Sequence, residues 1–160
     1  MRQRKPTGVV IGDAAGIGPE ITVKALFDPN VYRASRPILI GDAEAVGKAL
    51  RMTGFEMQVR PIATPAEARI QYPLLNVIDL RFPGLGDAPM GKVSTMAGHA
   101  FVRWFQKAIE LAEGGELGAI AYAPLNKEAI HKAGYNFHDE TDMIETFTST
   151  PAPLLLVVSM

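Results

Sequence analysis

Apolar residues recur along the chain in two alternating patterns. Short apolar runs that end close to glycine or proline predict β-strands. Longer segments, in which apolar residues return every three or four positions, predict amphipathic helices. The predicted strands cover residues 7–11, 38–40, 56–62, 74–80, 118–123 and 154–159. The predicted helices cover residues 19–27, 43–52, 94–113, 127–133 and 141–147.

The longest helical pattern runs from Ser94 to Glu113 and ends at two glycines. Its apolar positions lie on one face, which is typical of a helix that packs on a core. His99 lies next to this face, and we expect it to pack rather than to catalyse. The predicted core positions are Ala97, Phe101, Trp104, Phe105, Ala108, Ile109 and Ala112.

Alternation of strands and helices predicts an α/β fold with a largely parallel sheet. The runs at 118–123 and 154–159 are predominantly apolar, which is typical of buried strands. Because a buried strand is unusual at a chain end, we expect residues 1–160 to be the N-terminal part of a larger fold. Ligand sites in such sheets form beyond the carboxyl ends of the strands. The loops at 12–18, 41–42 and 123–127 occupy those positions.

Composition narrows the classes of function. The 160 residues suffice for one domain with a core, and the formal net charge is −1. That balance does not suggest a basic surface for nucleic acid, so we expect no nucleic-acid partner. The absence of cysteine excludes disulfides and thiolate metal sites. No apolar run approaches the roughly 20 residues that span a bilayer. We therefore expect a cytoplasmic protein without a membrane segment.

The first strand leads into a glycine-rich turn, Gly-Asp-Ala-Ala-Gly-Ile-Gly-Pro-Glu at residues 12–20. Its glycines would allow the backbone to approach a ligand closely, and Asp13 adds a carboxylate at the strand end. The spacing differs from that of the dinucleotide-binding fingerprint. The turn is therefore interpreted either as a ligand-binding loop or as a tight connection between strand and helix.

Two further segments carry candidate chemistry. Asn126 and Lys127 follow a predicted strand, where they either bind an anionic ligand or serve as a helix N-cap and a solvated lysine. The segment from His138 to Asp142 contains three carboxylates, an imidazole and a hydroxyl. This density suits a metal or a polyhydroxylated substrate, but it also suits an acidic helix start capped by Asp139 or Thr141.

Together these segments resemble the 4-hydroxythreonine-4-phosphate dehydrogenase family. The turn is similar to its Gly-Asp-Pro-Ala-Gly-Ile-Gly-Pro-Glu motif. Residues 91–98, Gly-Lys-Val-Ser-Thr-Met-Ala-Gly, resemble its element before a long helix. Residues 121–128, Ala-Tyr-Ala-Pro-Leu-Asn-Lys-Glu, followed by Ala133-Gly134, resemble its Thr-x-Pro-x-Asn-Lys-Glu…Ala-Gly segment.

The resemblance implies an α/β/α sandwich of the isocitrate and isopropylmalate dehydrogenase type, incomplete in this chain, with a subdomain crossover near 124–128. It implies a homodimer that oxidises a secondary alcohol of a hydroxy acid with NAD or NADP, with decarboxylation as a further step. A divalent metal (Zn, Mg, Co or Mn) would polarise the reacting oxygen. The family's metal-binding histidines lie downstream, so no metal ligand is expected within residues 1–160.

The chain departs from the family at one substrate-contacting motif, Gly-His-Thr-Glu, which reads Asp139-Glu140-Thr141-Asp142 here. Thr141 is kept, whereas Glu140 replaces a histidine. An ionised glutamate accepts hydrogen bonds and repels anions, so we expect a substrate other than 4-phosphohydroxy-L-threonine, such as a sugar-acid derivative. The residues expected to bind substrate are Glu140, Thr141, Asp13, Asn126 and Lys127.

Two functions remain open at this stage. The first is a metal- and NAD(P)-dependent dehydrogenase acting on a phosphorylated or unphosphorylated hydroxy acid. The second is a truncated or degenerate member of the family without catalytic activity, which binds a ligand or a dimer partner. A phosphate-transfer enzyme on a related fold is less favoured, because the segments at 91–98 and 121–128 resemble the dehydrogenases.

Overall fold

A computed structural model describes residues 4–151 and contains one sheet of five parallel strands. The strands lie side by side in the order β3-β4-β2-β1-β5, and each neighbouring pair is parallel. The predicted α/β class with a parallel sheet is confirmed. The strand bounds are Thr7–Val10 for β1, Pro37–Gly41 for β2, Gln58–Ile62 for β3, Leu74–Asp79 for β4 and Ala119–Tyr122 for β5.

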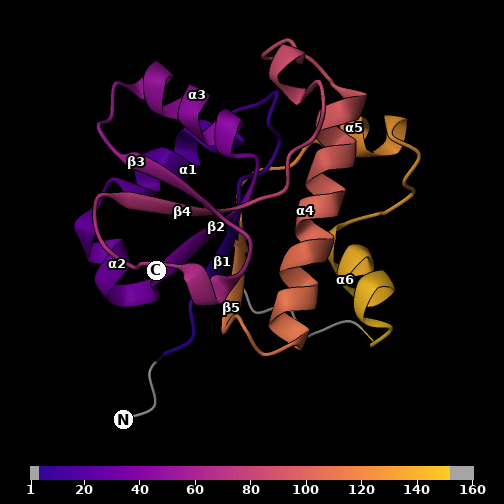
Figure 1. Cartoon of the computed structure of the whole chain (residues 1–160). Helices are drawn as coiled ribbons and strands as arrows, with labels where there is room; N and C mark the ends of the chain where they lie inside the picture. The colour runs from indigo at the N-terminus through magenta and orange to yellow at the C-terminus, as the bar shows by residue number, and fades with distance from the viewer. Residues whose placement is uncertain (1–3, 152–160) are drawn as a thin grey trace, which may run out of the picture.

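Helices cover both faces of the sheet, which gives three layers (Figure 1). On one face lie α1, α2 and α3, and on the other α4 packs against β1, β2 and β5. The short helix α5 and the helix α6 pack against α4. The helix bounds are Gly18–Leu26 for α1, Pro29–Ser35 for α2, Ala43–Thr53 for α3, Thr95–Glu113 for α4, Lys127–Lys132 for α5 and Glu140–Thr148 for α6.

Helix α2 was absent from the sequence prediction, although its start carries a recognisable signal. Asp28 accepts a hydrogen bond from the Asn30 backbone N–H at 2.8 Å, and Pro29 occupies the first helical position. An aspartate N-cap followed by proline is a preferred helix start. Two short 3₁₀ turns, at Pro65–Glu67 and Leu85–Asp87, also lie in segments that were not predicted as helical.

The core lies between α4 and the sheet. Trp104, Phe101 and Phe105 are fully buried there, and Ala97, Ala108 and Ile109 are buried with them. The predicted face of this helix is therefore confirmed except at Ala112, which is half-buried. The Trp104 indole N–H donates to the Leu80 carbonyl at 3.0 Å, so this ring also ties α4 to the end of β4.

The prediction that residues 118–123 form a buried strand is wrong in its burial. Three of the four residues of β5 are exposed, including Tyr122 at 44%. Within residues 4–151, β5 pairs only with β1 and therefore forms an edge of the sheet. The strand predicted at 154–159 lies outside the described residues. No helix in the described part of the chain is long and apolar enough to cross a membrane.

Candidate functional site

β1 and β5 are neighbours in the sheet, and the loops that follow them lead to opposite faces of it. The loop after β1 leads to α1 on one face, whereas the loop after β5 leads to α5, which packs against α4 on the other face. Parallel α/β sheets bind ligands at such a switch point, because the two diverging loops leave a crevice between them. The glycine-rich turn and the Pro124–Lys127 segment therefore face each other.

Gly12 is required where these two loops meet. Its φ is +76°, a left-handed conformation that glycine adopts without strain. A Cβ at this position would lie 2.6 Å from the Pro124 carbonyl oxygen. The Asp13 backbone N–H donates to that same oxygen at 2.9 Å. Gly12 thus allows the first loop to approach and bind the second, which places Asp13 beside Asn126.

The Asn126 side-chain amide lies near the Asp13 carboxylate and contributes a hydrogen-bonding interaction that lowers the pKa of this carboxyl. The Asp13 carboxylate also accepts from the Ala15 backbone N–H, which donates to Oδ1 at 2.9 Å. Asn126 also caps α5, because its Oδ1 accepts from the Ala129 backbone N–H at 3.0 Å. The N-cap interpretation of Asn126 is confirmed, and its amide is still directed at Asp13.

Burial determines the electrostatics of Asp13, which is 7% exposed. Burial raises the pKa of its carboxyl above the ordinary value of 3.8. Hydrogen bonds from Ala15, Asn126 and Gly16 act in the opposite direction and favour the ionised form. Asp13 is therefore a desolvated carboxyl that is stabilised by fixed donors, an arrangement that is common at functional sites.

A hollow of about 310 Å³ lies directly beside this pair, and we call it the switch-point hollow. The glycine-rich turn, the segment 91–93 and the loop after β5 each contribute to its wall. All three segments belong to motifs that carry the family resemblance. Lys92 is exposed and is the cation of this wall, and the sequence analysis did not select it. Lys92 lies two residues before Ser94, the N-cap of a long helix, and this position in the sequence could have marked it as a site residue.

The other predicted site residues do not line the switch-point hollow, although Leu125 borders both this hollow and the small space beside Lys127 and Glu140. Lys127 donates to the His138 carbonyl at 3.1 Å and so connects α5 with the start of α6. Glu140 is the first residue of α6, and with Lys127 it lines a space of only about 10 Å³. Thr141 follows it and is half-buried. The structure thus brings Asp13 and Asn126 together and places Lys127, Glu140 and Thr141 in a neighbouring group.

The acidic segment before α6 is a capped helix start in this structure. Asp139 accepts from the Asp142 backbone N–H at 2.9 Å, and Asp142 accepts from the His138 backbone N–H at 3.0 Å. Burial raises the pKa of the Tyr122 phenol, and the carboxylates of Glu140 and Asp139 raise it further. Tyr122 and Glu140 therefore lie close enough to interact electrostatically.

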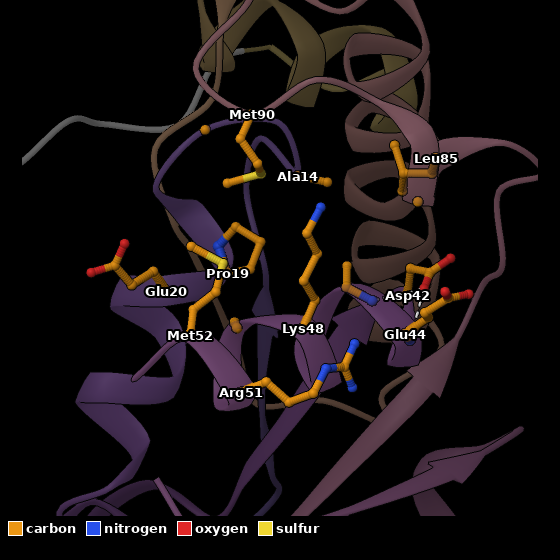
Figure 2. A pocket seen from close by; sticks show the side chains of 14 residues that line it. Ala14, Pro19, Glu20, Asp42, Glu44, Lys48, Arg51, Met52, Leu85 and Met90 are labelled. Carbon is orange, nitrogen blue, oxygen red and sulfur yellow. Dashed lines mark hydrogen bonds between the residues drawn. The ribbon is translucent and has the colours of Figure 1, made fainter. Parts of the chain in front are cut away.

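A second and larger cavity, of about 410 Å³, lies on the other side of the glycine-rich turn (Figure 2). Ala14, Gly16 and Pro19 of the turn form one wall, and α3 with residues 85–90 forms the others. We call it the α3 cavity. Lys48 extends from α3 into its middle toward Ala14, with Arg51 at its floor. Neither cation was selected from the sequence.

The described residues do not form a metal site by themselves. In the range 4–151, no group of three or more histidine, aspartate or glutamate side chains is arranged to hold a metal ion. The His99 ring packs between Phe82, which it meets edge-on at a centroid distance of 5.5 Å, and Tyr135 at 5.2 Å, so the expected packing role is confirmed. His131 is held against the Phe137 carbonyl at 2.9 Å.

The chain has a parallel sheet covered by helices on both faces and a hollow at the switch point. These features place it among the α/β proteins whose ligand sites lie at the carboxyl ends of the strands. Within this class, the chain belongs to the family described as pyridoxal phosphate biosynthetic protein PdxA, whose family model matches residues 33–160. The resemblance seen in the motifs is therefore confirmed at the level of the family.

Three known proteins illustrate the relationship. D-threonate 4-phosphate dehydrogenase of Cupriavidus necator is 40% identical over 152 residues, which cover 95% of this chain and 45% of that protein. The 4-hydroxythreonine-4-phosphate dehydrogenase structure from Burkholderia phymatum has a TM-score of 0.88 at 38% identity, over 92% of this chain and 44% of that one. A terephthalate 1,2-cis-dihydrodiol dehydrogenase from Burkholderia xenovorans LB400 has a TM-score of 0.65 at 25% identity, over 84% and 38%.

These three relatives are dehydrogenases by name, and the chain spans 45%, 44% and 38% of their respective lengths. The predicted membership of a dehydrogenase family is confirmed, and so is the expectation that the relatives are longer than this chain.

Proposed function

We propose that this chain supplies one wall of the active-site cleft of an NAD(P)-dependent dehydrogenase acting on a hydroxy acid. The observation that carries the proposal is the buried Asp13 carboxyl, which lines the switch-point hollow together with Asn126. The named activities of the relatives support the reaction class. NAD or NADP, when bound, accepts a hydride from the secondary alcohol.

Within the switch-point hollow, the three polar side chains have complementary roles. The Asp13 carboxylate accepts a hydrogen bond from a substrate hydroxyl, and its raised pKa makes it a better proton acceptor than a solvated aspartate. Asn126 holds that carboxylate in place through its amide. Lys92 attracts the carboxylate of the hydroxy acid as a point charge.

Glu140 and Thr141 set the choice of substrate in this proposal. Glu140 lies at the position where the resembling motif has a histidine, and a glutamate accepts from hydroxyls and repels phosphate. The chain therefore favours an unphosphorylated polyhydroxy acid over a phosphorylated one. A relative named for a cis-dihydrodiol supports the idea that this fold serves unphosphorylated diols. Lys127 supports the start of α6 through its bond to the His138 carbonyl.

The divalent metal, the dimer and the decarboxylation step belong to the family resemblance. Because residues 4–151 contain no metal-binding group of their own, no step here is assigned to a metal. In the proposal, a homodimer in the cytoplasm completes the cleft, and the 3-oxo acid that forms by oxidation then loses CO₂.

The second candidate function is ligand binding without catalysis, which the switch-point hollow of about 310 Å³ would also support. Under this alternative, the chain binds the hydroxy acid or a dimer partner without turnover. Both functions use the same switch-point hollow, so binding alone does not separate them.

A turnover assay separates the two. The chain is incubated with NAD or NADP, one of Zn²⁺, Mg²⁺, Co²⁺ or Mn²⁺, and either D-threonate or D-threonate 4-phosphate, and reduced nicotinamide is measured. Turnover that is lost in Asp13→Asn supports the dehydrogenase. Binding of the acids without turnover supports the alternative, and the absence of both overturns the two proposals.

A further inference from the structure

A cavity of about 240 Å³ lies at the amino ends of the strands, on the opposite edge of the sheet from the switch-point hollow. Four parts of the chain line it, namely Pro6 before β1, Arg36 before β2, segment 65–70 before β4 and Glu116 before β5. We call it the amino-end cavity. Because the two spaces lie beyond opposite ends of the strands, the amino-end cavity is separate from the candidate substrate site.

Arg36 has an unfavourable backbone conformation at this cavity. Its φ of +51° is left-handed, and it ends α2 at a position where glycine or asparagine is preferred because other side chains cost free energy there. Pro37 follows, and a residue before proline prefers an extended backbone. The Thr7 backbone N–H donates to the Arg36 carbonyl at 3.3 Å and fixes this conformation beside β1. Backbone strain of this kind is concentrated at ligand-binding sites.

The Arg36 side chain carries a second cost. Among the side chains of residues 4–151, the Arg36 Nε is the buried nitrogen that has no hydrogen-bond partner. The ion pairs of these residues include neither Arg36 nor Glu116. A buried donor without an acceptor is destabilising. A carboxylate bound in the amino-end cavity would accept from this nitrogen and offset that cost.

The wall that segment 65–70 forms is fixed by hydrogen bonds. Asn76, which is 1% exposed, accepts from the Arg69 backbone N–H at 3.1 Å and donates to the Arg69 carbonyl at 2.8 Å. The Glu67 carboxylate accepts from the Thr64 backbone N–H at 3.2 Å, and Glu67 does not line the cavity. The wall is therefore held in place by the chain itself.

The charges that line the amino-end cavity are balanced. Arg36 is its one cation and Glu116 its one carboxylate, and the other lining residues are apolar. These apolar residues are Pro6, Ile38, Pro65, Ala66, Ala68 and Ile70. The balance fits a zwitterion better than a net anion, and the apolar wall fits a hydrocarbon side chain. A volume of about 240 Å³ suits a ligand smaller than the drug-sized molecules that occupy larger pockets.

We propose that the amino-end cavity binds a free apolar α-amino acid. The Arg36 guanidinium donates to the carboxylate of the amino acid, because its planar fork matches carboxylate geometry. The ammonium group donates to Glu116 in a charge-assisted hydrogen bond. The hydrocarbon side chain packs against Ile38, Ile70 and the prolines. This site is distinct from the switch-point hollow, and its occupancy does not depend on the proposed dehydrogenase function.

Calorimetric titration of the whole 160-residue chain tests the proposal, with L-leucine, 4-methylpentanoate and 3-methylbutylamine as probes. The last two keep the branched tail of leucine and lack its ammonium group and its carboxylate, respectively. Each should bind about tenfold more weakly than L-leucine, because a charge-assisted hydrogen bond is worth about that factor. No binding of L-leucine, or equal binding of L-leucine and either analogue, would overturn the proposal.

Substitutions assign the two charged groups. Arg36→Gln and Glu116→Gln should each weaken L-leucine about tenfold. Glu116→Gln should not weaken 4-methylpentanoate, which has no ammonium group. The matched controls are Arg33→Gln on α2 and Glu113→Gln at the end of α4, which remove exposed charges outside the cavity and should leave the affinity unchanged. Unchanged affinity in Arg36→Gln would show that this cavity is not the amino-acid site.

Arg36→Gly separates a binding role of this residue from a structural one. Glycine adopts the left-handed conformation without strain, and the substitution removes the unsatisfied Nε. The variant should therefore unfold at a higher urea concentration than the unsubstituted chain and still lose L-leucine binding. A lower urea midpoint would show that Arg36 is retained for stability, and retained binding would exclude it from the site. Either result overturns the proposal, whereas titration of Arg36→Gln with D-threonate reports separately on the switch-point hollow.

Discussion

The side-chain amide of Asn126 favours the ionised form of the Asp13 carboxyl, although the two residues belong to different loops, those that follow β5 and β1. The same asparagine caps α5 through its Oδ1. One residue therefore fixes the start of a helix and orients the buried carboxylate of the candidate site. The pair can be separated experimentally, because capping needs the oxygen and the contact with Asp13 needs the amide.

Asp13→Asn should change the pH dependence of stability. Since the folded-state pKa of Asp13 is raised, the folded chain holds this proton more strongly than the unfolded chain. The unfolding free energy of the unsubstituted chain, relative to Asp13→Asn, should therefore fall as pH rises from about 3.8 through the raised pKa. Urea denaturation at a series of pH values measures this difference.

The control for net charge in that series is Asp28→Asn, at the exposed N-cap of α2, because asparagine caps helices about as well as aspartate. If the unfolding free energy of the unsubstituted chain, relative to Asp13→Asn, instead increases as pH rises, Asp13 is not desolvated in the folded chain.

Gly12→Ala should destabilise the fold by about 2–4 kcal/mol, because the left-handed backbone and a backbone clash both oppose a side chain. Its Cβ would lie 2.6 Å from the Pro124 carbonyl oxygen. Gly54→Ala is the matched control, since Gly54 has a similar φ of +70° and open space around it. It should cost only about 1 kcal/mol. Chemical denaturation measures both, and equal losses would mean that the two loops do not approach as described.

Gly98→Ala should cost about 2–3 kcal/mol, because overpacking displaces neighbouring backbone. Its Cβ would lie 2.3 Å from the Ala129 carbonyl, where α4 crosses α5. Gly47→Ala, inside α3, meets only the flexible end of Arg51 at 3.5 Å and should stabilise by about 0.5–1 kcal/mol. Thermal unfolding of both variants measures the contrast, and a neutral Gly98→Ala would refute the close packing of these helices.

Glu140→His should shift the ligand preference toward phosphate. Replacing a repelling carboxylate by a donor adds a charge-assisted contact, so the affinity ratio of D-threonate 4-phosphate to D-threonate should rise about tenfold. Calorimetric titration gives the ratio directly. Glu113→His, on an exposed residue at the end of α4, controls for the change in charge. An unchanged affinity ratio in Glu140→His would show that Glu140 does not determine the choice of substrate.

Much of the fold could be predicted because its signals are local and periodic. The buried face of α4 follows from helical spacing, and the start of α3 follows from Asp42, which accepts from the Glu44 and Ala45 N–H groups. The exposure of β5 could not be predicted, since its sequence is apolar and burial depends on which strands lie beside it. Helix α2 was missed because it is short, although its cap signal was present.

The candidate site could be predicted only in part, for a physical reason. Asp13 and Asn126 each follow a strand, and the parallel order of the sheet brings strand ends together. Lys48 and Arg51 lie within a helix, and only the three-dimensional structure shows that Lys48 extends into a cavity. Lys127 was selected for its charge, but in the structure it contacts the His138 carbonyl.

The most direct test of the central claim is a titration of the isotope-labelled chain with D-threonate, followed through the backbone amide spectrum. Binding at the switch-point hollow predicts shifts concentrated at Ala15, Gly16, Gly91 and Asn126, all of which border or contact the Asp13 carboxylate or its hollow. Asn126→Ser, which retains a capping oxygen but loses the amide, should weaken that response while α5 stays folded. Shifts confined to other parts of the chain, or no shifts at all, would contradict the assignment of this hollow as the substrate site.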